Sequence, residues 1–168
     1  NHISNLDPPV IATGIWRPCR FMAKEELFSN RWFGGFIRLL GAFPVKRGSG
    51  DRAALKAALE CLERGEALVM FPEGTRSEDG ELQEPEMGIG MIAYRSGAPI
   101  VPVYIHGTNR VMPKNGGIRL SPIGVRYGEP LSFRVAEGEK PGRAEYEAAA
   151  REVMAAIAAL RDEHRASR

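Results

Sequence analysis

The sequence predicts an α/β fold: a single-domain layered fold with a mostly parallel sheet flanked by helices. Three observations support this class. First, 168 residues correspond to about one domain and can bury a sizeable core. Second, hydrophobic residues make up 43% of the chain and charged residues 26%, which excludes a disordered or collagen-like protein. Third, short apolar runs alternate along the chain with segments of helical periodicity.

The elements are expected in a regular alternation. Helical spacing of apolar residues predicts helices within residues 21–40, 52–64, 88–96 and 142–165. Continuous apolar runs predict strands at 41–45, 67–71 and 100–105, and one or two short strands within 118–133. Asp51 is a plausible cap for the second helix, and Gly65 and Gly97 are expected to stop the second and third helices.

The composition also narrows the chemistry. Cys19 and Cys61 are the only cysteines, too few for a disulfide scaffold or a cysteine-based zinc site. No run of 18 apolar residues occurs, so no spanning helix is expected within the 168 residues. The chain begins with Asn1 rather than Met, and we interpret it as an N-terminally truncated fragment whose anchoring or targeting segment, if any, would lie upstream.

Positive charge is concentrated at the beginning of the chain. Residues 1–50 hold seven Lys and Arg against three Asp and Glu, whereas residues 51–100 hold five against ten. Within residues 16–40 the cations are interspersed with Trp and Phe, a mixture suited to an anionic surface. A solvated face with core aromatics would have the same composition.

His2 and Asp7 form a His-x4-Asp pattern near the start of the chain. Five residues apart on a regular helix, the two side chains would not face each other, so a turn through Ser4 and Asn5 would have to bring them together. A carboxylate on one imidazole nitrogen raises the basicity of the other, which makes a general base for an alcohol. Alone, such a pattern is more often a surface or capping pair than a catalytic one.

The string Phe-Pro-Glu-Gly-Thr-Arg-Ser, residues 71–77, directly follows an expected strand, where α/β sheets bind ligands. Gly74 allows close backbone approach, Arg76 could hold a phosphate bidentately, and Glu73 could pair with Arg76 or accept from a hydroxyl. A tight turn with an exposed arginine is the simpler alternative. Lys46 and Arg47 follow another expected strand, and Pro102 within the apolar run 100–105 predicts an edge or an irregularity.

Taken in order, His-x4-Asp, Gly-Ala-Phe-Pro-Val-Lys-Arg (41–47), Phe-Pro-Glu-Gly-Thr-Arg (71–76) and Val-Pro-Val (101–103) resemble the glycerolipid acyltransferase family. Within it, the pattern is most similar to the enzymes that acylate lysophosphatidate to phosphatidate. The resemblance covers about residues 1–108 and implies a glycerol-3-phosphate acyltransferase-like fold. The final sixty residues add no motif.

The resemblance implies a role for each matching residue. His2 would be the catalytic base and Asp7 the carboxylate that orients it. The substrate-binding set would be Arg47, Glu73, Gly74, Thr75 and Arg76, which in the family bind the glycerol phosphate. Val101, Pro102 and Val103 match a block linked to acyl-chain binding or packing. The scheme implies no metal, no cofactor and no acyl-enzyme, with acyl-CoA or acyl-carrier protein as the acyl donor.

Two departures from the family pattern keep alternatives open. Glu86 stands where a cation is usual, which leaves glycerol 3-phosphate, another lysophospholipid or a lyso-aminolipid as alternative acceptors. Together with the missing upstream segment, it also leaves a non-catalytic lipid-binding module on the same fold, and the fragment itself could be inactive. The resemblance implies work at an anionic membrane surface, on the cytoplasmic face of a bacterial cell membrane. A nucleic-acid binder is disfavoured by the acidic middle third and the lack of a recognisable binding module.

Overall fold

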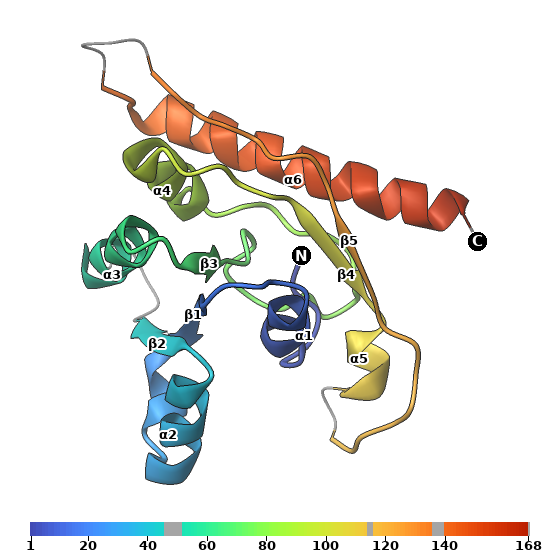
Figure 1. The fold of residues 1–168 in the computed structure, drawn as a ribbon. Helices are drawn as coiled ribbons and strands as arrows, with labels where there is room; N and C mark the ends of the chain where they lie inside the picture. The colour runs from blue at the N-terminus through green and yellow to red at the C-terminus, as the bar shows by residue number, and fades with distance from the viewer. Residues whose placement is uncertain (46–51, 114–115, 136–139, 168) are drawn as a thin grey trace. The chain divides into compact units, whose positions relative to one another are not determined.

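A computed structural model describes residues 1–45, 52–113, 116–135 and 140–167 (Figure 1). The chain divides into two compact units. The first unit consists of Asn1–Asp7 with Phe71–Arg168, and the second unit consists of Pro8–Met70.

The second unit contains a three-stranded parallel sheet with the strand order β2-β1-β3. The central strand β1 places the buried Phe21 beside Ala42 of β2 and Val69 of β3. The sheet is therefore parallel and carries helices, as the sequence predicted. Its elements are α1 (Asp7–Thr13), β1 (Cys19–Lys24), the 3-10 helix η1 (Glu25–Phe28), α2 (Arg31–Leu39), β2 (Ala42–Val45), α3 (Arg52–Glu63) and β3 (Ala67–Val69).

The prediction of one helix within residues 21–40 was wrong in its first part. Residues 19–24 form the central strand β1, and only Arg31–Leu39 form an α-helix. The helix begins where the Asn30 side chain accepts hydrogen bonds from the N–H groups of Trp32 and Phe33. The prediction failed because the apolar residues of β1, η1 and α2 recur along the sequence at intervals of three, four and seven, which are also the intervals of one amphipathic helix. The expected cap Asp51 lies outside the described residues.

Glu66, Arg20 and Arg64 form an ionic cluster near the first residues of β1 and β3. Both carboxylate oxygens of Glu66 accept from the guanidinium of Arg20, at 3.0 and 3.1 Å, and Arg64 donates at 3.0 Å. These hydrogen bonds lower the pKa of Glu66 to about 2. Beside it, burial raises the pKa of the Cys61 thiol to about 11, which suits a packing role for this side chain.

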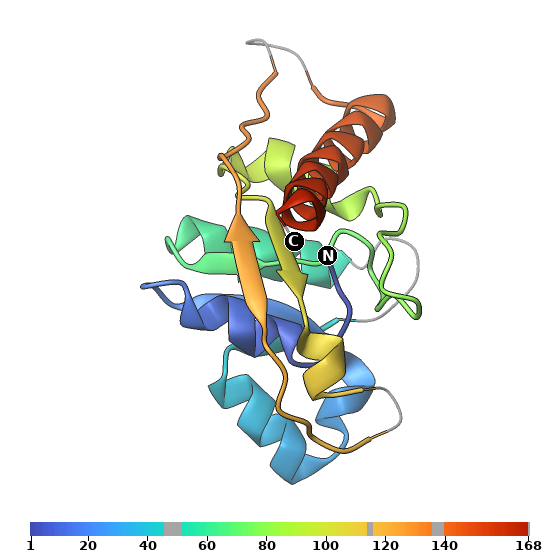
Figure 2. The ribbon, with the colours of Figure 1, turned by 90° about the vertical axis from the view of Figure 1, so that its right-hand side faces the viewer.

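The first unit is built around the long helix α6 (Arg143–Ala166), which packs against α4 (Gly88–Ser96) and against β4 (Val103–His106). Strand β4 pairs antiparallel with β5 (Gly124–Tyr127), and the two arrows lie side by side in Figure 2. The short helix α5 (Thr108–Val111) follows β4. The buried apolar residues of this unit are Ile89, Ile92, Ala93, Tyr104, Ile105, Phe133, Ala149, Ala150, Val153, Met154 and Ile157.

Several predictions for the first unit are confirmed. Helix α4 ends at Gly97, whose φ of 62° is the left-handed conformation of a helix stop. Helix α6 matches the predicted helix within one residue at each end. Gly90 is required at the crossing of the two helices, because a Cβ there would collide with the Tyr146 carbonyl. The α/β class with a parallel sheet flanked by helices is thereby confirmed, and the single-domain extent over 1–168 stays a prediction.

The strand expected at 100–105 is shorter and shifted. Ile100 forms an isolated bridge with Leu131, and the continuous strand starts only at Val103. Pro102 lies between the two and has no N–H to donate, which accounts for the predicted irregularity. No helix within the described ranges has both the length and the apolar character to cross a bilayer.

Candidate active site

His2 and Asp7 are brought together by a tight turn at the start of the first unit. The Asp7 N–H donates to the Ser4 carbonyl at 3.2 Å, which closes the chain over residues 5 and 6. The His2 Nδ1 atom then lies 2.7 Å from Asp7 Oδ2. The turn predicted through Ser4 and Asn5 therefore exists, and it delivers the pair that a helix could not.

The Asp7 carboxylate is fully buried and is surrounded by donors. Oδ2 accepts from the His2 ring and from the N–H groups of Ile3 and Ser4, each at 2.7 Å. Oδ1 accepts from the Thr108 hydroxyl at 2.6 Å. A set of four donors suits an ionised carboxylate, which can only accept hydrogen bonds. The buried charge is thus compensated on both oxygens.

This environment fixes the state of the His2 ring. Because an Asp7 carboxylate only accepts, the ring nitrogen that faces it, Nδ1, is the donor, and Nε2 is the nitrogen that does not contact Asp7. Nε2 makes no hydrogen bond to any residue that the structure describes, and the side chain is 17% exposed. Phe71 stacks on one face of the ring, with centroids 4.0 Å apart and planes 21° apart. The ring is held rigidly, and its basic nitrogen is available to a substrate.

The loop 71–77 holds the backbone of His2. The His2 N–H donates to Glu73 Oε1 at 2.9 Å, and the His2 carbonyl accepts from the Ser77 N–H at 2.8 Å. Glu73 is 4% exposed, and its Oε2 accepts from the Gln83 N–H at 3.1 Å. Both Glu73 oxygens are therefore used by backbone groups, and the Glu73–Arg76 ion pair considered from the sequence does not form.

Gly74, Thr75 and Arg76 form the outer part of this loop. Gly74 has a φ of 64° and its N–H closes a turn onto the Phe71 carbonyl at 3.1 Å. Gly74 and Thr75 are exposed, and Arg76 is half-buried. The Arg76 guanidinium has neither an ion pair nor a hydrogen bond to another residue of the described ranges, so it is available to an anion.

The Val101–Val103 block and Asn1 connect the site to β4. Val101 is 46% exposed, Pro102 is buried and Val103 begins the strand. The Asn1 side chain pairs with both backbone groups of Ile105, accepting from its N–H at 2.8 Å and donating to its carbonyl at 3.0 Å. The residue before the histidine thus fastens the turn to the strand.

Comparisons with known proteins identify the family of this chain. A family model described as Acyltransferase matches residues 1–106. The chain belongs to this acyltransferase family. The chain is 38% identical over 114 residues to a 1-acyl-sn-glycerol-3-phosphate acyltransferase of Bacillus subtilis, covering 66% of the chain and 53% of that relative. It is 34% identical to the protein of the same name from Streptococcus pneumoniae, covering 67% of the chain and 40% of that relative.

A solved structure is similar over nearly the whole acyltransferase chain. The crystal structure of the 1-acyl-sn-glycerophosphate (LPA) acyltransferase PlsC from Thermotoga maritima superposes with a TM-score of 0.73 at 29% identity, covering 98% of this chain and 64% of that one. The chain therefore spans about half the length of the two bacterial relatives and about two thirds of the solved structure.

Arg47 and Glu86 are the residues at two further positions of the acyltransferase pattern. Arg47, predicted to bind substrate, lies outside the described residues. Glu86, which replaces an expected cation, lies directly against Gly74: a Cβ built on Gly74 would be 3.0 Å from Glu86 Cγ. The Glu86 N–H donates to the Pro72 carbonyl at 2.7 Å, so the acidic residue is attached to the same loop as Arg76.

Sequence reasoning missed three residues of the candidate site: Asn1, Phe71 and Thr108. In the sequence, Phe71 stands out only as part of the 71–77 string, and Asn1 only as the first residue of the chain. Thr108 lies 101 residues from Asp7 in the sequence, and no motif marks it. Within the described ranges, including this site, no group of three or more His, Cys, Asp or Glu side chains is placed to hold a metal ion.

Proposed function

We propose that this acyltransferase moves a fatty acyl group from an acyl thioester to the free hydroxyl of lysophosphatidate, giving phosphatidate. The carrying observation is the His2 ring, with Nδ1 donating to buried Asp7 and Nε2 open to a substrate. The names of the similar proteins from Bacillus subtilis and Streptococcus pneumoniae support the choice of acceptor. His2 and Asp7 are the proposed catalytic residues.

The proposed reaction is a direct transfer. His2 Nε2 removes the proton from the acceptor hydroxyl, and the oxygen attacks the thioester carbonyl carbon. Asp7 stabilises the imidazolium that forms. The carbon–sulfur bond then breaks, the carbonyl is restored, and the leaving thiolate takes the proton from His2. One ester and one free thiol result from each turnover.

The loop after β3 supplies the proposed acceptor site. Arg76 has no partner within the described ranges, and a guanidinium can bind a phosphate through two parallel hydrogen bonds. Arg47 would add a second cation, and Gly74 and Thr75 would contribute an exposed turn that allows close approach. For Glu73 the contacts favour an indirect part in binding, since its oxygens hold the backbone of His2 and Gln83.

The proposed donor is acyl-CoA or an acyl-carrier protein, with no further cofactor. The thioester itself provides the leaving group, and His2 performs both proton transfers, from the acceptor hydroxyl and to the leaving thiolate. Val101, Pro102 and Val103 would line or support the acyl-chain site, an assignment that the exposure of Val101 favours.

The proposed partner surface is an anionic membrane, on the cytoplasmic side in a bacterial cell. Helix α2 supports it, because Trp32 is 88% exposed and Leu39 85%, with Phe33 and Phe36 also exposed. Residues 27–50 carry Arg31, Arg38, Lys46 and Arg47 and no acidic residue. A basic helix with an aromatic face is typical of segments that lie in a membrane interface.

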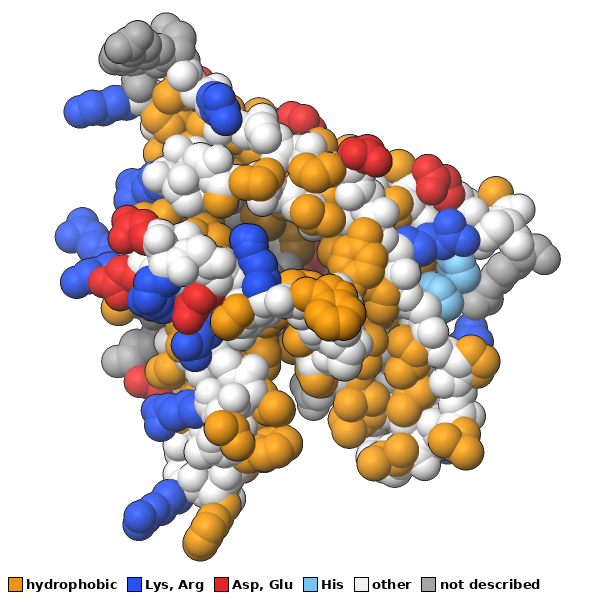
Figure 3. Space-filling view, viewed as in Figure 1, with side chains coloured by type: hydrophobic (Ala, Val, Ile, Leu, Met, Phe, Trp, Pro, Cys, Tyr) orange, Lys and Arg blue, Asp and Glu red, His pale blue; other side chains and the backbone are white. Residues whose placement is uncertain are grey.

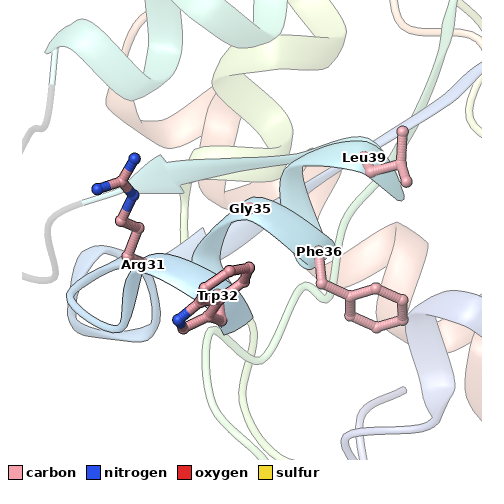
Figure 4. A pocket seen from close by; sticks show the side chains of 5 residues that line it. All are labelled: Arg31, Trp32, Gly35, Phe36 and Leu39. Carbon is pink, nitrogen blue, oxygen red and sulfur yellow. The ribbon is translucent and has the colours of Figure 1, made fainter.

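The shape of α2 suits this role. Trp32, Gly35, Phe36, Leu39 and Arg31 line a groove on the helix, and Figure 4 shows the Trp32 and Phe36 side chains extending to the same side of it. Hydrophobic and basic side chains lie beside each other over α2 at the lower left of Figure 3. The apolar groups would enter the interface while the cations meet lipid phosphates.

The decisive experiment supplies the purified protein with palmitoyl-CoA or palmitoyl-carrier protein and a panel of acceptors in lipid vesicles. We expect phosphatidate and free thiol in equal amounts with lysophosphatidate as acceptor. Product from glycerol 3-phosphate or a lyso-aminolipid instead would change the acceptor assignment. Lipid binding without thiol release, in a protein whose unfolding is cooperative, would support a non-catalytic lipid-binding module.

A further inference from the structure

Thr108, the first residue of α5, contacts the carboxylate of the proposed catalytic pair. Its hydroxyl donates to Asp7 Oδ1 at 2.6 Å, and both side chains are fully buried. We infer that Thr108 is a positioning residue that fixes the plane of the Asp7 carboxylate and, through it, the orientation of the His2 ring. This inference rests on the proposed base role of His2, and its test includes a measurement that needs no activity.

The need for such a residue follows from the contacts of Asp7. Three donors converge on Oδ2, whereas Thr108 is the donor to Oδ1. Both oxygens of a carboxylate turn together about the Cβ–Cγ bond, a soft torsion, so the donor to Oδ1 restrains the same rotation as the three donors to Oδ2. The Thr108 hydroxyl therefore narrows the range of orientations of the carboxylate plane, and it satisfies a buried acceptor that would otherwise be left unpaired.

The backbone around Thr108 is fixed by the fold. Gly107 precedes it with a φ of 86°, and a Cβ on Gly107 would collide with the Pro122 carbonyl. Thr108 begins α5, where its carbonyl accepts from the Met112 N–H at 2.9 Å. The Ser4 hydroxyl donates to the Met112 carbonyl at 3.3 Å. Both ends of α5 therefore touch the turn that carries His2 and Asp7.

A threonine at this position offers more than a hydroxyl. Its β-branched side chain has few accessible rotamers, so the hydroxyl is directed at Asp7 with little loss of conformational freedom. Serine keeps the donor with more freedom, and valine keeps the shape without the donor. The three side chains therefore separate the hydrogen bond from the packing.

The first measurement compares steady-state kinetics of Thr108→Val, Thr108→Ser and the parent protein. We expect Thr108→Val to lower kcat by about 10- to 100-fold, the factor that a hydrogen bond to a charged group typically contributes. The acceptor KM should stay within about twofold, because Thr108 touches no substrate. Thr108→Ser should recover most of the loss. Thr13→Val, which removes an exposed hydroxyl bonded only to the Val10 carbonyl, is the matched control.

The second measurement observes the His2 ring directly, by nitrogen-15 NMR of the protein without substrate. The signal is assigned as the one absent in His2→Gln. We expect a slowly exchanging Nδ1 proton in the parent protein and in Thr108→Ser, and a broadened or lost signal in Thr108→Val. This readout remains informative even if lysophosphatidate is not the acceptor or no acyl transfer is found.

The outcomes decide the inference. A folded Thr108→Val that keeps both its kcat within twofold and its Nδ1 proton signal would overturn it. Equal loss of kcat in the Ser and Val variants would also overturn it, because the effect would then come from packing. If Thr108→Val does not fold, the same NMR comparison is made between Thr108→Ser and the smaller Thr108→Ala.

Discussion

His2 and Arg76 would act at different moments of the proposed reaction, and kinetics can separate them. His2 removes a proton only in the transition state. His2→Ala should therefore lower kcat by about 10²- to 10⁴-fold and leave the acceptor KM nearly unchanged, as measured with lysophosphatidate vesicles. A rise in KM with an unchanged kcat would place His2 in substrate binding instead.

Arg76 would hold the acceptor before the chemistry begins. Arg76→Ala should raise the acceptor KM, at a cost of about 1.5–3 kcal/mol in binding free energy, while the donor KM moves little. Arg76→Lys should recover only part of the loss, because an ammonium cannot make the two parallel hydrogen bonds. Arg151→Ala, which removes an exposed arginine from α6, serves as the control. A selective rise in donor KM would assign the loop to the donor phosphates.

Glu86 puts a negative charge on the loop that carries Arg76, since its side chain lies against Gly74. Glu86→Gln removes that charge with little change in shape. We expect the KM for lysophosphatidate to fall by about two- to fivefold, the size of an exposed charge interaction. The same change should leave the KM of a zwitterionic lysophospholipid unchanged. An opposite ranking of the two acceptors would show that Glu86 favours the anionic one.

At the scale of one element, α2 carries the proposed membrane contact. Trp32→Ala combined with Leu39→Ala removes its two most exposed apolar side chains. Binding to phosphatidylglycerol vesicles, measured by sedimentation, should weaken by about tenfold or more. Leu120→Ala removes an equally exposed leucine from the other unit and should change binding less than twofold. Loss of solubility in the parent but not in the double variant would indicate self-association through α2.

Elements whose limits are set by local chemistry were predictable, and the others were not. Helices α4 and α6 have clear apolar stripes and, for α4, a glycine stop, so their bounds followed from the sequence. Strand β1 could not be recognised from the sequence. A central parallel strand is stabilised by its two neighbouring strands, and β1 has no continuous apolar run, since Phe21 is its only buried residue. The antiparallel pairing of β4 with β5 likewise depends on tertiary contacts.

The same division holds within the site. The motifs pointed to His2, Asp7 and the 71–77 loop, and the structure brings these together in the first unit. What the motifs could not reveal is how Glu73 is used, because its partners are backbone N–H groups that any sequence would have. Thr108 could not be found either, since its partner is distant in the chain and a single threonine carries no pattern.

For the molecule as a whole, acid sensitivity should centre on Glu66. Its pKa of about 2 lies below the ordinary value for a glutamate, so its contribution to folding is present at neutral pH and is lost as the pH falls from about 4.5 toward 2. Urea midpoints measured across this range should fall less steeply in Glu66→Gln than in the parent protein. Exposed Glu63→Gln is the control and should follow the parent curve. Parallel curves for all three proteins would remove Glu66 from the acid response.

The long-range contacts of the site also determine when it can assemble during synthesis of the chain. The bonds that assemble it join residues 71, 101 and 104 positions apart: His2 with Glu73, Asp7 with Thr108, and Asn1 with Ile105. At about 5–20 residues per second, translation from Asp7 to Thr108 takes about 5–20 s. Throughout that interval the nascent chain contains His2 and Asp7 but not yet Thr108, the residue that donates to Asp7 Oδ1. The candidate site can therefore assemble only after Thr108 has been synthesised.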